Sequence, residues 1–281
     1  MKSATFRAMG TDVVALGDDV DFAERTRIWF DEAEAIFSRF LPSSELSAVN
    51  DNPQRIVPVS TTMASCLRVA RDLRDMTGGL VDPAIGGALI DWGYDTTFVD
   101  IADLNTSPDS SPVDDWSIGG RLVARRPGTR LDLGGIAKGW TCDQAVERGL
   151  ADVVSAGGDV RSAHPETVVN IEDPWGEIAI PVLLGVGGLA TSSTTRRRWK
   201  AGAGEAHHIV DPRTQAPAVT PVYSSTVMAA TAVAAEAGAK AVLLHGQDGL
   251  AWAEKQPWIE AALVVWHDGS VYATTGWEMA A

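Results

Sequence analysis

The sequence of 281 residues predicts an α+β fold with antiparallel sheets and packed helices. Stretches with apolar residues every three or four positions predict helices, and they alternate irregularly with short β-rich runs. The chain closes with two β-rich runs on either side of an Asp-Gly pair, which is typical of a hairpin. Mixed helix pairs and hairpins favour this fold class over a regular doubly wound sheet.

Composition excludes several classes of partner. The formal net charge is −14, with 45% hydrophobic and 21% charged residues. Such a chain buries a large core, but an acidic surface does not suit nucleic acid, because phosphate binding needs a basic field. Two cysteines are too few for a disulfide framework and favour a cytoplasmic location. No apolar run near the start is long enough for a signal or membrane segment, so we expect no membrane anchor.

The first third of the chain predicts strands and two helices. Residues 4–16 have strand composition interrupted by Met-Gly-Thr, and an apolar stripe then predicts a helix over 21–40. A second stripe predicts a helix over 60–76, which Thr-Gly-Gly at 77–79 ends.

The remainder predicts further strands around two helices. A strand at 129–133 leads through two glycines into a helix that runs to about residue 150. An alanine-rich helix is predicted over 229–244, followed by the closing hairpin at 261–274. The other strands are expected at 152–155, 167–172, 178–184 and 206–210.

The segment LDLGGIAKGW, residues 131–140, is the strongest of several double-glycine turns. Asp132 precedes the turn and Lys138 follows it at the start of a helix. Amides at a helix start, together with a cation, suit a phosphate or pyrophosphate. The glycines equally suit a structural turn, and the spacing matches neither a P-loop nor a dinucleotide fingerprint.

The segment HHIVDPRT, residues 207–214, couples a short strand to a turn. In a regular strand its two histidines face opposite ways. A histidine at a strand end suits a general base, although a lone histidine is more often a satisfied structural group.

Six segments together resemble the ApbE family of FAD:protein FMN transferases, in the correct order over nearly the whole chain. They are FRAMGTDV, FSRFLPSSELSAVN, GGLVDPAIGGALIDWGYD, LDLGGIAKGW, SAGGDV and HHIVDPRT. The resemblance implies one domain of the T-fold type over residues 1–281. It also implies binding of FAD, a magnesium ion (Mg2+) that helps to split the pyrophosphate, transfer of FMN to a threonine of an acceptor protein, and release of AMP.

The resemblance assigns roles to individual residues. His208 matches the histidine that deprotonates the acceptor threonine, and Phe40 stands where the family often has a stacking tyrosine. A phenyl ring keeps the stacking but lacks the hydroxyl. The positions that match FAD contacts are Met9, Phe40, Leu80, Val81, Asp82, Asp132, Lys138 and Ile209.

One departure concerns the metal site. In the family the metal ligands are a backbone carbonyl, which corresponds to that of Gly135 here, and an aspartate and a threonine on a helix near the end of the chain. At the last two positions this chain has Glu236 and Lys240. Magnesium requires oxygen ligands, so an ammonium cannot serve. We expect Lys240 to pair with Glu236 and to replace some or all of the magnesium. Two alternatives remain: Lys240 points into solvent while Glu236 binds a metal through water, or the two form an ordinary surface pair.

The sequence is compatible with three functions. The first is a cytoplasmic flavin transferase acting on an acceptor protein. The second is a non-catalytic member that binds FAD with a degenerate metal site, and the third is an FAD pyrophosphatase.

Overall fold

The computed structural model describes residues 1–96, 101, 115–172, 179–195, 197–202 and 204–277. It confirms the mixture of helices and antiparallel sheets. Two compact units make up the chain. The sheet unit comprises Met1–Asp31, Lys138–Ser193 and Thr220–Ala281, and the cavity unit comprises Glu32–Ala137 and Thr194–Val219. A single domain over residues 1–281 stays a prediction.

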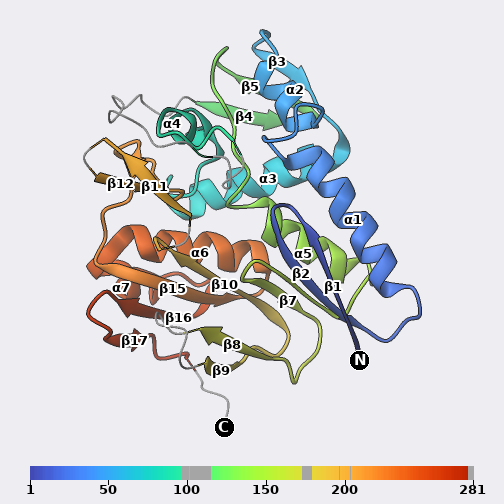
Figure 1. The fold of residues 1–281 in the computed structure, drawn as a ribbon, viewed down its shortest axis with the longest axis vertical. Coiled ribbons are helices and arrows are strands. Elements are labelled where there is room, and N and C mark those ends of the chain that lie inside the picture. Colours follow the sequence, from blue (N-terminus) through green and yellow to red (C-terminus); the bar gives the residue numbers. More distant parts are fainter. Residues whose placement is uncertain (97–100, 102–114, 173–178, 196, 203, 278–281) are drawn as a thin grey trace. The chain divides into compact units, whose positions relative to one another are not determined.

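An antiparallel sheet, eight-stranded over the described residues, forms the centre of the sheet unit (Figure 1). Its order is β1-β2-β6-β7-β10-β15-β16-β17. The bounds are β1 Lys2–Ala8, β2 Thr11–Gly17, β6 Val153–Ala156, β7 Asp159–Ser162, β10 Gly187–Ser193, β15 Val222–Ala229, β16 Ile259–Trp266 and β17 Val271–Ala273. A separate hairpin pairs β8 (Val168–Glu172) with β9 (Ala179–Leu183).

The predicted closing hairpin is confirmed, and the predicted strand material at 4–16 forms a second hairpin at the other end of the sheet. β1 and β2 join through a two-residue turn, in which Met9 and Gly10 have φ of 51° and 71°. A side chain at positive φ is unusual outside such turns. β16 and β17 join around Asp268 and Gly269, as the sequence predicts.

Helix α6 (Ala232–His245) packs on β10 and β15 of this sheet. It is buried on almost every face, which its alanine-rich sequence favours. A Cβ at Gly188 would lie 2.2 Å from Ala232 N, so only glycine allows the strand to approach the helix this closely. The short helices η3 (Gly246–Asp248) and α7 (Gly249–Ala253) follow α6.

Helix α5 (Ala137–Glu147) adjoins the start of α6 through glycine. A Cβ at Gly139 would lie 2.8 Å from the backbone of Val233. The Trp140 ring packs 6.0 Å from Trp29 of helix α1 (Phe22–Phe37). Trp29 Nε1 also donates to the carbonyl of Thr141 at 3.0 Å.

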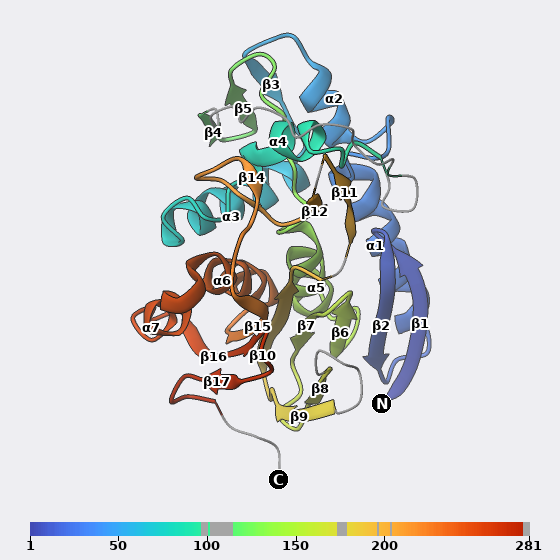
Figure 2. The same cartoon turned by 60° about the vertical axis from the view of Figure 1, so that its left-hand side comes forward.

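The cavity unit consists of helices and small sheets (Figure 2). Its helices are α2 Glu45–Asp51, α3 Thr61–Met76, η1 Pro83–Ile85 and α4 Gly86–Asp91. The sheets are β3-β5-β4, β11-β12 and β13-β14. Their strands are β3 Ile56–Pro58, β4 Trp116–Gly119, β5 Leu122–Arg125, β11 Arg198–Ala201, β12 Gly204–His207, β13 Val210–Asp211 and β14 Ala216–Pro217.

Several expected elements differ from the structure. The predicted strand at 129–133 is absent, because the side chain of Asn50 takes the place of a neighbouring strand: it donates to Leu131 O and accepts from Leu131 N, both at 2.8 Å. The helix predicted over 21–40 ends at Phe37, where the hydroxyl of Ser38 accepts from Phe40 N. The strand predicted at 206–210 is interrupted after His207, and the predictions omitted several strands, among them β7, β10 and all of β15.

Candidate functional site

The structure divides the predicted site residues between the two units. Met9, Lys138, Glu236 and Lys240 belong to the sheet unit. The cavity unit holds Phe40, Leu80, Val81, Asp82, Asp132, Gly135, His208 and Ile209. Each unit therefore positions its own set of predicted site residues.

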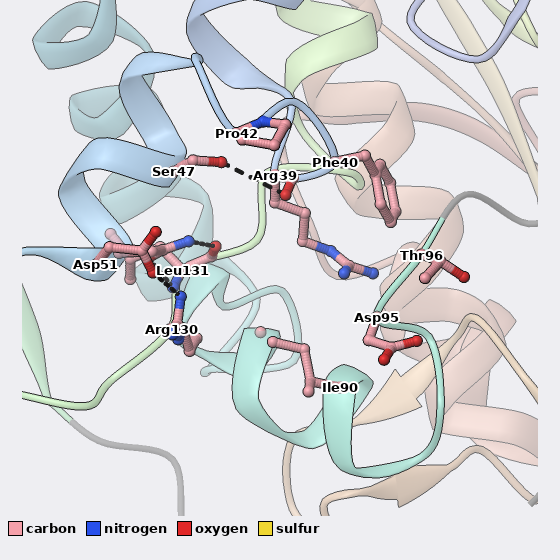
Figure 3. A pocket seen from close by; sticks show the side chains of 12 residues that line it. Arg39, Phe40, Pro42, Ser47, Asp51, Ile90, Asp95, Thr96, Arg130 and Leu131 are labelled. Atoms are coloured by element: carbon pink, nitrogen blue, oxygen red, sulfur yellow. Dashed lines mark hydrogen bonds and ion pairs between the residues drawn. The ribbon is translucent and has the colours of Figure 1, made fainter.

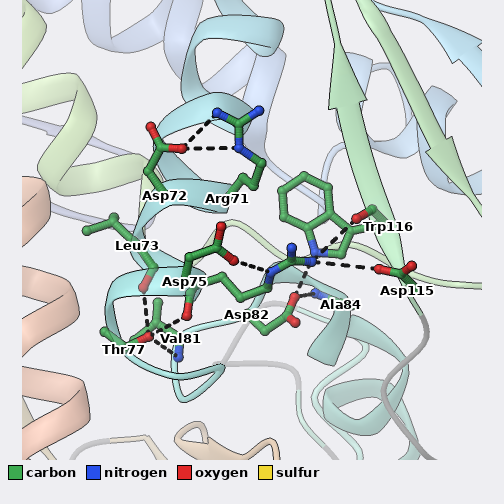
Figure 4. A network of polar contacts seen from close by, with 11 residues as sticks. Arg71, Asp72, Leu73, Asp75, Thr77, Val81, Asp82, Ala84, Asp115 and Trp116 are labelled. Carbon is green, nitrogen blue, oxygen red and sulfur yellow. Dashed lines mark hydrogen bonds and ion pairs between the residues drawn. The ribbon is translucent and has the colours of Figure 1, made fainter.

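The segment Leu80–Asp82 follows helix α3 and is anchored by polar contacts (Figure 4). Leu80 and Val81 are buried, and Val81 N donates to Thr77 Oγ1 at 3.1 Å. Asp82 caps η1: its Oδ1 accepts from Ala84 N at 2.9 Å and from Trp116 Nε1 at 2.8 Å. These bonds fix the backbone of the segment.

The Asp132 turn lies against that segment. Asp132 N donates to Pro83 O at 2.7 Å, and its Oδ1 accepts from Gly134 N at 2.8 Å. A Cβ at Gly86 would lie 2.6 Å from Arg130 O, so the two stretches of backbone are in close contact. The two predicted FAD-binding segments of the cavity unit are therefore neighbours.

A cavity of about 510 Å³ lies within the cavity unit. That volume suits a small ligand or part of a larger one. Phe40 and Arg39 form part of its lining, and Figure 3 shows the Arg39 side chain extending toward Asp95 and Thr96. Arg39 Nε donates to Asp132 Oδ2 at 2.5 Å. The cavity is thus lined by an aromatic residue and by an arginine that pairs with Asp132.

The two histidines of HHIVDPRT have different environments. His207 is buried; its Nδ1 accepts from Ile209 N at 3.3 Å, and its Nε2 lies 3.0 Å from Ala218 O. Burial lowers the pKa of His207, which favours the neutral ring with its proton on Nε2. His208 is partly exposed in the bend that follows. The two histidines differ in exposure, but the strand ends at His207, so the regular strand expected through both is absent. His207 is therefore the structural histidine.

Lys138 is the centre of a buried ion cluster in the sheet unit. Its Nζ lies 2.8 Å from Glu236 Oε1 and 2.8 Å from Asp159 Oδ2. Gly139 N donates to Glu236 Oε2 at 3.2 Å. Lys240 Nζ approaches Glu236 Oε1 at 3.7 Å. The Glu236–Lys240 pair thus exists, but Lys138 is the closer partner.

The side chain of Glu236 is 5% exposed and that of Lys240 is 18% exposed. A surface pair and a Lys240 that points into solvent are therefore both wrong.

Burial and the two lysines determine the charges of this cluster. Burial raises the pKa of Glu236, but Lys138 and Lys240 outweigh it and hold that pKa below its ordinary value. Burial lowers the pKa of Lys138, yet the charges of Asp159 and Glu236 hold it well above its ordinary value. For Asp159, burial and the charge of Glu236 raise the pKa to about 7. Glu236 and Lys138 therefore form a permanent ion pair near neutral pH.

The residues around Glu236 do not fit a divalent cation. Both Glu236 oxygens already accept N–H donors, and an ammonium cannot ligate a metal. Among the described residues, no group of three or more His, Cys, Asp or Glu side chains is arranged to hold a metal ion. A cation placed here would have to displace Lys138 from Glu236.

Two residues of these clusters, Asp159 and Arg39, were not predicted from the sequence. Asp159 is the acidic residue within SAGGDV, and that motif was the available signal for it. Arg39 lies within FSRFLPSSELSAVN, where arginine resembles an ordinary surface residue because its buried partner, Asp132, is distant in sequence.

Comparison with known proteins decides the family. The sequence profile of the ApbE family matches residues 9–263. The chain belongs to the ApbE family. Within ApbE proteins, it is 31% identical over 235 residues to the "FAD:protein FMN transferase" of Rhodobacter capsulatus. That match covers 77% of this chain but 45% of the relative, so the chain spans about half the length of that protein. The Haemophilus influenzae protein of the same name is 27% identical, with 88% of this chain and 81% of the relative covered.

Solved ApbE structures share the fold. The ApbE protein of Thermotoga maritima superposes with a TM-score of 0.84 at 25% identity, covering 98% of this chain and 97% of that one. The flavin transferase ApbE of Vibrio cholerae gives a TM-score of 0.82 at 22% identity, again with 98% and 97% covered. None of the helices in the described residues has the length and apolarity needed to cross a membrane.

Proposed function

We propose that this chain binds FAD and transfers its FMN moiety to a threonine of an acceptor protein, releasing AMP. The observation that carries the proposal is the family match over residues 9–263, with relatives named FAD:protein FMN transferase. The cavity lined by Phe40, and by Arg39 with its bond to Asp132, supports nucleotide binding. The remaining FAD contacts are proposed at Met9, Leu80, Val81, Asp82, Lys138 and Ile209.

The reaction is a phosphoryl-type transfer. The threonine oxygen forms a bond to the phosphorus of the FMN moiety, the bond from that phosphorus to the bridging pyrophosphate oxygen breaks, and AMP leaves with the bridging oxygen. His208 accepts the threonine proton as general base. The partial exposure of His208 supports this role, since His207 is buried with both ring nitrogens engaged.

We further propose that the lysines of the ion cluster replace a magnesium ion here. Lys138 and Lys240 supply positive charge at Glu236, where the family resemblance implies a metal. Gly135, the other implied ligand, lies in the Asp132 turn of the cavity unit. A fixed cation of this kind can stabilise charge without coordination.

Transfer and metal use are tested together. The purified chain is incubated with FAD and an acceptor peptide containing threonine, with magnesium or with a chelator, and AMP and flavinylated peptide are quantified by mass spectrometry. We expect transfer that the chelator lowers less than twofold. Release of AMP without acceptor would instead indicate a pyrophosphatase. FAD binding without release of AMP would indicate a non-catalytic, FAD-binding protein. This is the second candidate function, because both carboxylate oxygens of Glu236 already accept N–H donors.

The double variant Glu236→Asp with Lys240→Thr tests metal replacement directly. We expect it to gain Mn²⁺ binding, detected by electron paramagnetic resonance, and FAD turnover that rises with magnesium. If neither increases above the unmodified chain, the lysines do not replace the ion. The variant Lys255→Met, at an exposed site, is the control.

A cytoplasmic location is part of this proposal. Cys66 and Cys142 are both buried and form no disulfide, as a reducing compartment allows. Detection of the protein in fractionated cells tests the location.

A further inference from the structure

Arg39 lies in the loop after α1, and its charge is buried. Its side chain is 6% exposed, and that of Asp132 is 11% exposed. Arg39 Nε donates to Asp132 Oδ2, while Gly134 N donates to the other carboxylate oxygen. An unpaired buried carboxylate would repel a phosphate, so Arg39 removes an obstacle to an anionic ligand.

The guanidinium of Arg39 also packs on aromatic rings. Its central carbon lies 4.1 Å from the Phe40 ring centroid and 4.7 Å from that of Tyr94. The Phe40 and Tyr94 rings are 5.4 Å apart, and Tyr94 packs 5.6 Å from Trp199. This stack holds the Phe40 ring at the edge of the cavity, because each ring is supported by the next.

One donor of Arg39 has no hydrogen-bond acceptor among the described residues. Arg39 Nη2 is buried and unpartnered, in contrast to Nε. A buried guanidinium nitrogen without an acceptor costs free energy, and only part of that cost is offset by the ring contacts. The cavity that Arg39 lines is the space from which a ligand oxygen can reach this group after a small side-chain movement.

We propose that Arg39 makes this cavity selective for an aromatic nucleotide that carries phosphate. Arg39 acts as a positioning residue: it neutralises Asp132, holds Phe40 for stacking against the aromatic base, and retains a donor for a ligand oxygen. The inference rests on the proposed function, in which FAD is the nucleotide. Lysine cannot reproduce this role, since its ammonium lacks the planar stacking surface and the fixed, diverging N–H donors of a guanidinium.

The test compares Arg39→Met, Arg39→Lys and the control Arg71→Met. Arg71 is an exposed residue of α3 in the same unit, away from the cavity lining. Isothermal titration calorimetry gives the Kd values of FAD, AMP and riboflavin for each variant, and circular dichroism verifies folding. We expect Arg39→Met to raise the Kd of FAD and AMP by about 10- to 100-fold, and that of riboflavin, which carries no phosphate, by less than about threefold. Arg39→Lys should lose about three- to tenfold for FAD, and Arg71→Met should bind normally.

Two outcomes separate the inference from the proposed function. If the unmodified chain does not bind FAD, the proposed function itself fails. If it binds FAD and a folded Arg39→Met variant binds it within twofold of that affinity, the role of Arg39 is wrong. An equal loss for riboflavin and AMP would also overturn the selectivity for phosphate. Should Arg39→Met not fold, Arg39→Lys decides, because unchanged FAD affinity in that variant contradicts the need for a planar guanidinium.

Discussion

Lys138 and Arg39 each neutralise a buried aspartate, yet they use their donors differently. Lys138 contacts Asp159 and Glu236 at 2.8 Å each, and the second oxygen of Glu236 accepts from Gly139 N. The Nε of Arg39 donates to Asp132, and its guanidinium packs on the rings of Phe40 and Tyr94. Its Nη2 has no hydrogen-bond acceptor among the described residues. In the ion cluster each carboxylate has an ion-pair partner in Lys138, whereas Arg39 keeps a donor that a ligand can use. Two buried ion pairs can therefore differ in how many donors they leave for other groups.

The largest expected loss of stability comes from a change in the ion cluster around Lys138. Lys138→Met leaves two buried carboxylates facing each other, so we expect a loss of about 3–5 kcal/mol in the free energy of unfolding at pH 7. Urea unfolding measures it, with Lys255→Met as the exposed control. A cost below about 1 kcal/mol would show that the cluster is not a closed ionic unit.

The pH dependence of Lys138→Met follows from the pKa of Glu236. In the native chain that pKa lies below its ordinary value of 4.5, so the ion pair stabilises the fold above that pH and its contribution is lost as the pH falls. In the variant, the carboxylates take up a proton more readily. The deficit relative to the native chain should therefore be largest at neutral pH and shrink toward pH 4. A deficit that grows on acidification would contradict this electrostatic account.

The next effect concerns the support of the cavity. Asn50→Ala removes both bonds to the backbone of Leu131, which lines the cavity. Leaving two buried backbone groups without partners should cost about 2–4 kcal/mol in unfolding experiments and weaken FAD binding. Asn52→Ala is the control, since its side chain accepts an exposed bond from Gln54 N. If FAD affinity survives unchanged, the cavity does not need this support.

A pair of neighbouring glycines gives a more local test of the same cavity. Gly86→Ala would place a Cβ 2.6 Å from Arg130 O, whereas Gly87→Ala meets no heavy atom within 4 Å. We expect Gly86→Ala to lower stability by about 1–3 kcal/mol, while Gly87→Ala is neutral or stabilises the helix by a few tenths of a kcal/mol. Thermal unfolding distinguishes them. Equal melting temperatures for the two variants would contradict the close contact.

The smallest effect is expected at Lys240. Its ammonium lies 3.7 Å from Glu236 and is the more distant of the two lysines from that carboxylate. Lys240→Met should therefore cost less than about 1 kcal/mol, well below Lys138→Met in the same urea experiment. Similar costs would show that the two lysines share the charge of Glu236 equally.

Local sequence patterns predicted much of the fold. The stripe over 60–76 matches α3, which spans Thr61–Met76, because its apolar face alone specifies a helix. The closing hairpin was equally clear from Asp268 and Gly269. Strand 129–133 failed because β-rich composition does not reveal which group satisfies the backbone, here a side chain about 80 residues earlier in the chain.

The candidate site was only partly accessible from the sequence. The family register located Glu236 and Lys240 on one helix, and helical spacing predicted their contact. The stronger partner, Lys138, is 98 residues from Glu236, and no spacing rule relates residues so far apart. The pairing of Arg39 with Asp132 could not be predicted for the same reason, because the two residues are 93 positions apart.

The start of α6 depends on a residue of another helix. Asp143 of α5 accepts from Ala232 N at 2.8 Å and from Val233 N at 3.0 Å, and Thr231 caps Ala234 N. Two of the first amides therefore gain their acceptors only when α5 and α6 are docked. Their hydrogen exchange reports on separation of the two helices rather than on fraying of α6. The first turn of α6 should accordingly exchange as slowly as its middle.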